Sequence, residues 1–302
     1  MSAINYPHIA AMAFNTPLLA TGTLAQTVSE FLHKRLLGSA ELTTQPSMAA
    51  KKTKEYVVGD PEQGDKVAVI AVHGLLVPRM GYIDSGCEEV MSYERLQSQI
   101  NTALKDDSVQ EIVLDINSGG GSAQGGFECA DFIKQAKSKK PIRAIVNMNA
   151  YSGAYLIACA CTEIIISKTA GVGSIGVYLK RLDLTEHYEQ QGAKIHTFFR
   201  GATKVDFHPD MALSDAETAR INTSIDETYQ MFVDYVADNR NLSADKVKAT
   251  QADTYLGQKA IDLGLADRLA TPQDAINSIV GNIAQQASNQ RMIAQASALQ
   301  SL

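Results

Sequence analysis

The pattern of apolar and polar positions changes near residue 55. Residues 1–54 are punctuated by proline and polar stretches, with one possible amphipathic helix over 23–37, and they end in the breaker-rich segment GSAELTTQPSMAAKKTK. From residue 55 onward, apolar runs alternate with segments of helical periodicity. We therefore expect an N-terminal extension or linker over 1–54, a folded domain over 55–270 and a C-terminal tail, helical or disordered, over 271–302.

Short apolar runs bounded by turn residues predict the strands of the central domain: KVAVIAVHG, EIVLDI, IRAIVNM, EIIIS and AKIHTFF. Two segments between them have helical spacing. In SYERLQSQINTALKD, Leu96, Ile100 and Leu104 recur every four residues, and FECADFIKQAKS ends near Pro141. Strands this apolar, separated by helices, predict an α/β fold with a mostly parallel sheet that is covered on both faces.

Two helices are predicted after the last of these strands. Ser214 and Glu217 form a capping box that opens a long helix, with a buried stripe at Ile221, Ile225 and Phe232. The segment YLGQKAIDLGLADRL predicts a helix that ends at Gly264.

The charge of the chain limits its partners. The formal net charge is −6, and no basic cluster is larger than Lys51, Lys52 and Lys54, which argues against nucleic acid or an anionic membrane as the main partner. The N-terminus lacks the charged start and apolar run of a signal peptide, and no stretch reaches the roughly 18 apolar residues of a membrane span. We expect a cytoplasmic protein.

The four cysteines, Cys87, Cys129, Cys159 and Cys161, show no CxxC pairing. Cys159 and Cys161 stand two apart on a probable helix and would point to different faces. We expect reduced thiols in the core, with no metal site and no disulfide.

A glycine-rich turn, DINSGGGSAQGG over residues 115–126, follows one predicted strand and precedes a helix. This is where open α/β sheets bind ligands through backbone amides. A dinucleotide loop fits poorly, because Gln124 stands where the third glycine of GxGxxG belongs. The same amides could instead stabilise a developing oxyanion.

Ser152 follows the predicted strand IRAIVNM and precedes Gly153 and an apolar helix. A serine at such a turn is either a helix N-cap or a nucleophile at the carboxyl edge of the sheet, with the next amide as an oxyanion donor. The flanking residues do not form a GxSxG motif, so the N-cap interpretation stays open.

A serine nucleophile needs a base, and no pattern singles out any of the six histidines. Lysine can serve when burial lowers its pKa. Lys204, in FFRGATKVDF, lies just past a predicted strand. By itself it is more typical of a solvated lysine in a turn than of a general base.

Five segments, taken in order, resemble the Ser/Lys peptidase family that contains signal peptide peptidase A: INSGGGS, AYSGAYLIA, AGVGSIGV, GATKVD and YLGQKAIDLGLADRL. The resemblance runs from about residue 65 to 270. It implies a ClpP/crotonase-like fold of stacked βαβ units and a serine endopeptidase without a cofactor or metal. One departure is Gly119, where the family usually has proline.

The resemblance also assigns roles to individual residues. It implies that Ser152 is the nucleophile, that Lys204 is the general base and that Ser174 orients the lysine amine. The oxyanion amides would come from Gly121, with Gly120, and from Gly153.

The segments NYPHIAAMAFNTPLL, SGGGSAQGGFECADFI and TAGVGSIGVYL are most similar to the capsid-maturation branch of lambda-type phages. This similarity implies cleavage of phage coat, scaffold or portal proteins inside a procapsid, self-cleavage, and a homo-oligomer whose neighbouring subunits help to shape the site. In that branch a scaffold segment commonly follows the protease, and the tail over 271–302 could be its junction or remnant.

Two other functions stay open. One is a cytosolic enzyme similar to signal peptide peptidase that degrades short peptides with the same chemistry. The other is a non-catalytic assembly protein or a crotonase-like acyl-CoA enzyme, because that fold shares glycine-rich oxyanion turns.

Overall fold

The fold was analysed in a computed structural model that describes residues 15–22, 26, 56–58, 66–79 and 90–300. Almost all of the predicted helix over 23–37 lies outside these residues, as do Cys87 and the basic cluster Lys51, Lys52 and Lys54.

The main sheet has eight strands, and its central strands are parallel. β3 (Lys66–His73), β6 (Val109–Ser118) and β8 (Ile142–Tyr151) lie side by side, and β9 (Glu163–Ile166) and β10 (Gly171–Gly173) both pair in parallel with β8. Three short strands complete the sheet: β2 (Tyr56–Val58) and β11 (Thr254–Leu256) are antiparallel to their neighbours, and β12 (Arg268–Leu269) pairs in parallel with β9. This arrangement confirms the predicted mostly parallel α/β sheet.

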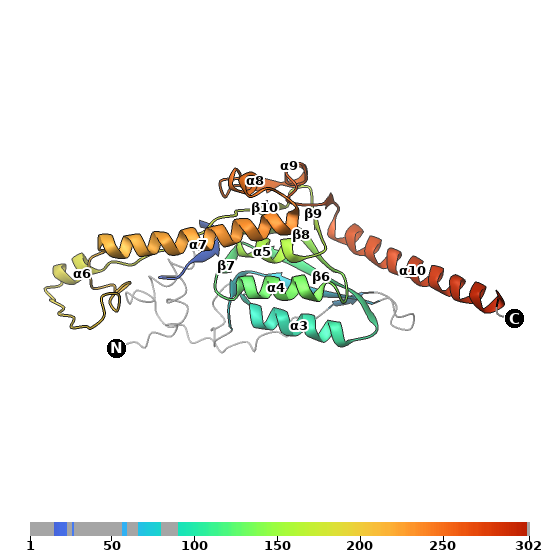
Figure 1. The fold of residues 1–302 in the computed structure, drawn as a ribbon, viewed down its shortest axis with the longest axis horizontal. Helices are drawn as coiled ribbons and strands as arrows, with labels where there is room; N and C mark the ends of the chain where they lie inside the picture. Colours follow the sequence, from blue (N-terminus) through green and yellow to red (C-terminus); the bar gives the residue numbers. More distant parts are fainter. Residues whose placement is uncertain (1–14, 23–25, 27–55, 59–65, 80–89, 301–302) are drawn as a thin grey trace.

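Helices pack on both faces of this sheet, as the apolar strands predicted (Figure 1). On one face lie α3 (Tyr93–Lys105), α4 (Gly126–Ala136), α5 (Gly153–Ala160) and the end of α7 (Asp215–Arg240). On the other face, α10 (Pro272–Gln300) packs its first turns through Ala275, Ile279 and Ile283. A hydrophobic core lies on each face of the sheet, and alternate residues of β6 pack into each one. Ile112 and Leu114 pack into the core beneath α3, α4 and α5, and Val113 packs into the core beneath α10.

A second, four-stranded sheet has the order β1-β7-β4-β5. It is formed by β1 (Leu18–Ala20), β7 (Gly120–Ser122), β4 (Leu75–Val77) and β5 (Val90–Ser92). β1 comes from the segment that the sequence assigned to an extension, yet Leu19 is fully buried in the core. The extension therefore contributes a strand to the folded domain, because three apolar residues after Pro17 cover an edge that would otherwise be open.

The predicted strand AKIHTFF does not form. Residues 193–199 have no regular structure, and Phe198 is 92% exposed. A strand needs a partner edge for its backbone groups, and no described segment of the same chain pairs with this one.

The long helix α7 starts as predicted. The Oγ atom of Ser214 accepts a hydrogen bond from the backbone N–H of Glu217 at 3.1 Å. The predicted buried stripe is correct only at Phe232, because Ile221 and Ile225 are half-buried. The N-terminal half of α7 extends beyond the core toward α6 (Thr185–Gln190), where fewer elements cover it (Figure 1).

The final elements are α8 (Ala244–Lys248) and α9 (Gly257–Asp262). As predicted, Gly264 follows α9 with a φ of 78°, and its N–H bonds to the carbonyl of Ile261 at 2.8 Å. Among the described residues, no helix combines the length and apolar character required to cross a bilayer.

Three of the cysteines, Cys129, Cys159 and Cys161, have free thiols, and all three are buried in the core, where the sequence predicted them. Burial raises the pKa of the Cys129 and Cys159 thiols to about 12. At neutral pH these thiols are protonated and behave as small apolar groups.

Candidate active site

Ser152 occupies the turn between β8 and α5 with an unusual backbone. Its φ of 54° and ψ of −119° lie outside the regions that residues other than glycine commonly adopt. The surrounding bonds hold this conformation, since the Ser152 N–H donates to the carbonyl of Gly173 at 2.8 Å and the Ser152 carbonyl accepts from Leu156 at 2.9 Å. Strained residues held in this way cluster at active sites.

The side chain of Ser152 is buried and unpaired. The residue is 1% exposed, and its Oγ atom has no hydrogen-bond partner among the described residues. It makes no cap bond to α5, although it stands at the N-cap position. The N-cap interpretation is therefore wrong, because the hydroxyl accepts no hydrogen bond from the first backbone N–H groups of α5, and that bond defines a side-chain cap.

The glycine-rich turn lies against the Ser152 turn. A Cβ atom at Gly120 would lie 2.8 Å from the amide nitrogen of Gly153, and a Cβ at Gly153 would lie 3.3 Å from the amide nitrogen of Gly121. Gly120 also has a φ of 98°. The structure thus brings together all three predicted oxyanion glycines, and only residues without side chains let the two backbones approach this closely.

Ser118 fixes the glycine turn from within the fold. Its Oγ atom donates to the carbonyl of Gly74 at 2.6 Å and accepts from the N–H of Gly120 at 3.0 Å. The Gly120 amide is therefore already bonded within the turn, which leaves the amides of Gly121 and Gly153 as the candidate oxyanion donors; Gly121 also stands opposite Leu19 in the antiparallel pairing of β1 with β7. Sequence analysis missed Ser118, although it stands within the INSGGGS segment.

Ser174 lies beside the Ser152 turn through strand register. Gly173 pairs with Tyr151 in the parallel β10–β8 ladder, so the serines that follow each strand are neighbours in the backbone. The Ser174 N–H donates to the carbonyl of Asp253 at 2.8 Å, and Ser174 itself has a φ of 54°. The structure therefore places the backbone of Ser174 beside that of Ser152.

Lys204 lies in a turn between α6 and α7 and is exposed to solvent. Its backbone N–H bonds to the carbonyl of Gly201 at 3.1 Å. Because the Ser152 hydroxyl has no partner among the described residues, the Lys204 amine does not reach it within one chain. The structure therefore does not join the two predicted members of the dyad in a single chain.

One buried and one partly exposed ion pair hold the segment that carries Lys204. The carboxylate of Glu217 accepts from the N–H of Phe207 at 2.7 Å and from the guanidinium of Arg181 at 3.3 Å. Arg220 makes two bonds to Asp206, at 2.7 and 2.8 Å, and this pairing lowers the pKa of Asp206. From the sequence, Glu217 was predicted only as part of a capping box, and its contact with the Lys204 turn was not predicted.

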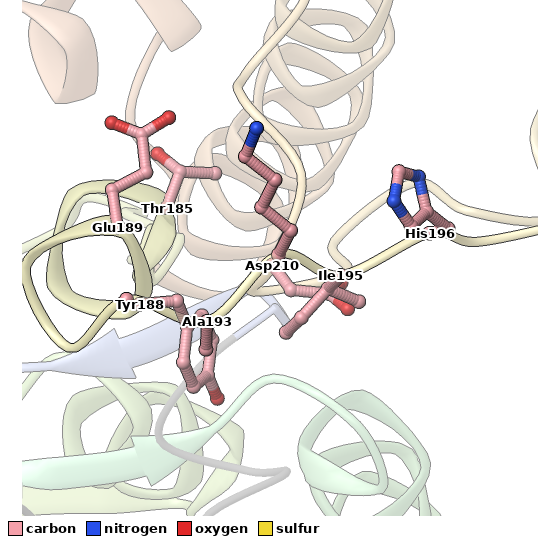
Figure 2. Close-up of a pocket in the computed structure, with 9 residues that line it drawn as sticks. Thr185, Tyr188, Glu189, Ala193, Ile195, His196 and Asp210 are labelled. Atoms are coloured by element: carbon pink, nitrogen blue, oxygen red, sulfur yellow. The ribbon is translucent and has the colours of Figure 1, made fainter.

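A cavity of about 400 Å³ lies on the same segment, away from the glycine turns. Thr185 and Glu189 contribute from α6, and Ile195 and His196 from the irregular segment that follows (Figure 2). Neither Ser152 nor a glycine of the β7 turn lines it. Within the described ranges, no group of three or more His, Cys, Asp or Glu side chains is placed to hold a metal ion.

The closing motif around Gly264 has a structural role. The carboxylate of Asp267 accepts from the N–H of Ile164 at 2.6 Å and from Arg240 at 2.7 and 3.0 Å. The hydroxyl of Tyr155 donates to the carbonyl of Leu265 at 2.9 Å. These bonds join the closing motif to β9 and to α5, the helix that begins directly after Ser152.

Known proteins show similarity to this chain over most of its length. It is 35% identical over 90% of its length to the head-tail preconnector protein GP5 of Enterobacteria phage P21, and 33% identical over 90% to the capsid assembly protease C of Escherichia phage lambda. The chain spans 57% and 65% of the lengths of these two relatives. A putative signal peptide peptidase SppA from Enterococcus faecium is 27% identical over 82% of this chain and 69% of its own.

The model of peptidase family S49 matches residues 134–286, a range that contains Ser152, Ser174 and Lys204. The glycines of the β7 turn precede this range, but they lie against Gly153 in space. The fold, the order of the segments and this match agree. The chain belongs to peptidase family S49.

Proposed function

We propose that the chain is a serine endopeptidase in which Ser152 attacks the peptide carbonyl. The observation that carries the proposal is the Ser152 turn itself, where a buried hydroxyl without a partner sits on a strained backbone beside the amides of Gly121 and Gly153. Such a hydroxyl is free to react, and preset amides stabilise the charge that develops on the carbonyl oxygen.

In this mechanism the neutral amine of Lys204 takes the proton of Ser152 as the Oγ atom bonds to the carbonyl carbon. The Gly121 and Gly153 amides, with Gly120 shaping the turn, hold the oxyanion. The lysine then gives its proton to the leaving amine as the peptide bond breaks, and water later hydrolyses the acyl-enzyme. Ser174 would hold the lysine amine in position through its hydroxyl.

The lysine in this mechanism would come from a neighbouring copy of the chain. Two features support this: Lys204 is exposed, and the segment before it carries exposed apolar side chains at Ile195, Phe198 and Phe199. Residues 193–199 also have the composition of a strand, and no described segment of their own chain pairs with them. A homo-oligomer would cover the apolar residues and bring Lys204 of one copy toward Ser152 of the next.

We further propose that the substrates are phage coat, scaffold or portal proteins, processed in the bacterial host cytoplasm or inside a procapsid, with self-cleavage of the chain's own flanks. The names of the phage P21 and lambda relatives support a role in head assembly. Co-expression with the neighbouring coat and scaffold genes tests it: a shortened product should appear on a gel with the active chain and not with Ser152→Ala.

The peptidase proposal itself is tested by mass spectrometry of the products from the active chain, Ser152→Ala and the control Ser138→Ala. Ser138 is an exposed serine after α4 whose hydroxyl bonds to the carbonyl of Gln135, so its loss should change nothing. Both Ser152→Ala and Lys204→Ala should abolish cleavage. Acyl-CoA binding by a chain whose Ser152 resists a serine-directed covalent probe would favour the crotonase-like alternative instead.

A further inference from the structure

The edge of β7 beside Ser152 is already occupied by a strand of the same chain. β1 pairs with β7 in an antiparallel ladder in which Leu19 stands opposite Gly121 and Ala20 opposite Gly120. The ladder extends at both ends, because the N–H of Thr21 donates to the carbonyl of Gly119 at 2.9 Å and the N–H of Ala123 donates to that of Pro17 at 3.3 Å.

The carbonyl of Leu19 lies at the centre of the candidate site. A Cβ atom at Gly153 would lie 3.0 Å from the Leu19 oxygen, and one at Gly120 would overlap it. The same Gly153 Cβ would lie 3.3 Å from the amide nitrogen of Gly121. The Leu19 carbonyl therefore sits among the three glycines proposed to hold the oxyanion.

β1 is held on its other edge as well. Leu18 exchanges two backbone hydrogen bonds with Tyr178, at 2.9 and 3.2 Å, and Asn15 donates to the carbonyl of Lys180 at 2.8 Å. The strand thus lies in a channel between the glycine turn and the segment after β10. Extended peptides are commonly recognised in this way, with main-chain bonds supplying affinity and side-chain pockets supplying selectivity.

We propose that this channel is the site for an extended substrate peptide, and that Leu18–Ala20 is its resident occupant and blocks the site in the full chain. The inference rests on the proposed function, because it takes Ser152 as the reactive group. Another peptide binds only after β1 leaves the edge of β7.

The channel also defines the peptide that would fit. Leu19 is fully buried in the main core cluster, so the corresponding position takes an apolar side chain. Ala20 lies opposite Gly120 and is also buried, which leaves room only for a small residue. The preferred ligand is therefore an extended peptide with an apolar residue followed by a small one.

Tethering makes the block effective. A strand attached to its own site has an effective concentration near the millimolar range, so a free peptide of modest affinity competes poorly. Cutting the chain between β1 and β2 removes this advantage and leaves the described contacts of β1 unchanged.

The experiment uses the full chain with a site-specific protease sequence inserted between Ala40 and Glu41. Labelling of Ser152 by a serine-directed covalent probe is timed before the cut, and again after the cut and dilution. Labelling should become at least about tenfold faster, and a synthetic peptide of residues 15–22 should slow it again. The same peptide with Leu19→Asp should have no effect.

Two point variants test the block in the uncut chain. Thr21→Pro removes the N–H that bonds to Gly119, at a residue outside the core, and should speed labelling. Gly22→Ala is the control, since a Cβ there meets nothing within 4 Å. Equal labelling rates in the uncut, cut and Thr21→Pro proteins, with no effect of the peptide, would overturn the inference.

Binding of the fluorescent 15–22 peptide to cut Ser152→Ala protein, followed by anisotropy, separates this inference from the peptidase proposal. Peptide binding without any labelling of the unsubstituted protein would leave the blocked channel in place and reject the peptidase. Rapid labelling that is indifferent to both the cut and the peptide would keep the peptidase and reject the block.

Discussion

The backbone N–H of Ser152 donates to the carbonyl oxygen of Gly173 at 2.8 Å. This bond continues the β8–β10 register past the strand ends and joins the turns that carry Ser152 and Ser174. Two serines that are 22 positions apart in the sequence thereby lie at the ends of two paired strands, β8 and β10, which fix their backbones relative to each other.

The close contact between the glycine turns predicts a large effect of one added methyl group. Gly120→Ala would place a Cβ atom 2.8 Å from the amide nitrogen of Gly153, at a φ that alanine disfavours. We expect cleavage to fall at least 100-fold, as when an oxyanion donor is displaced. Rates of peptide cleavage and urea unfolding measure the two effects.

Gly192→Ala is the matched control for this substitution. Gly192 also has a positive φ, 72°, but a Cβ there meets nothing within 4 Å. The unfolding free energy of Gly192→Ala should fall by only about 1 kcal/mol, because alanine is strained at a positive φ. Its cleavage rate should not change. Equal loss of cleavage in both variants would show that the contact at Gly120 is unimportant.

The buried pair of Arg181 and Glu217 predicts that the Lys204 turn depends on a residue in α7. Glu217→Gln removes one of the two carboxylates that pair with the buried Arg181 guanidinium and leaves only Asp183, at 3.4 Å; breaking a buried ion pair in this way costs up to about 3 kcal/mol. We expect lower unfolding free energy and slower cleavage. Glu227→Gln, an exposed position on the same helix, should change neither quantity.

The Asp206–Arg220 pair predicts a pH dependence of stability. Arg220 lowers the pKa of Asp206 below its ordinary 3.8, so the pair stabilises the fold above that pH and is lost as pH falls through the lowered pKa. Thermal melting of the unsubstituted chain and of Asp206→Asn, between pH 2 and 6, should differ most at the upper end. Curves that differ equally at every pH would contradict this assignment.

A shared dyad predicts complementation between inactive variants. Ser152→Ala and Lys204→Ala should each be inactive alone, but a mixed oligomer contains sites with Ser152 from one copy and Lys204 from another. Refolding the two variants together should restore a fraction of the cleavage. Mixed oligomers, verified by mass, that stay inactive would place both groups in one chain.

Much of the fold could be predicted because its signal is local. The apolar runs of β3, β6 and β8 and the spacing of Leu96 and Ile100 in α3 are strong patterns, and the structure has these elements at the predicted places. The capping box at Ser214 and the stop at Gly264 were also predictable, because each depends on a few adjacent residues.

Other features depend on contacts that no local pattern contains. β1 reads as part of an extension because three residues give no periodicity, and only the edge of β7 makes them a strand. Residues 193–199 have the apolar composition of a strand, but no partner edge is found in the part of the chain that the structure describes. At the site, the glycines and serines could be predicted from resemblance, whereas the contacts of Ser118 and Glu217 required the fold.

The identity of the nucleophile is tested most directly by peptide mapping, which locates the adduct of a serine-directed covalent probe in the unsubstituted chain, Ser152→Ala and Lys204→Ala. We expect one adduct, on Ser152, absent from Ser152→Ala and formed far more slowly in Lys204→Ala. An adduct on a different serine, accompanied by undiminished cleavage in Ser152→Ala, would contradict it.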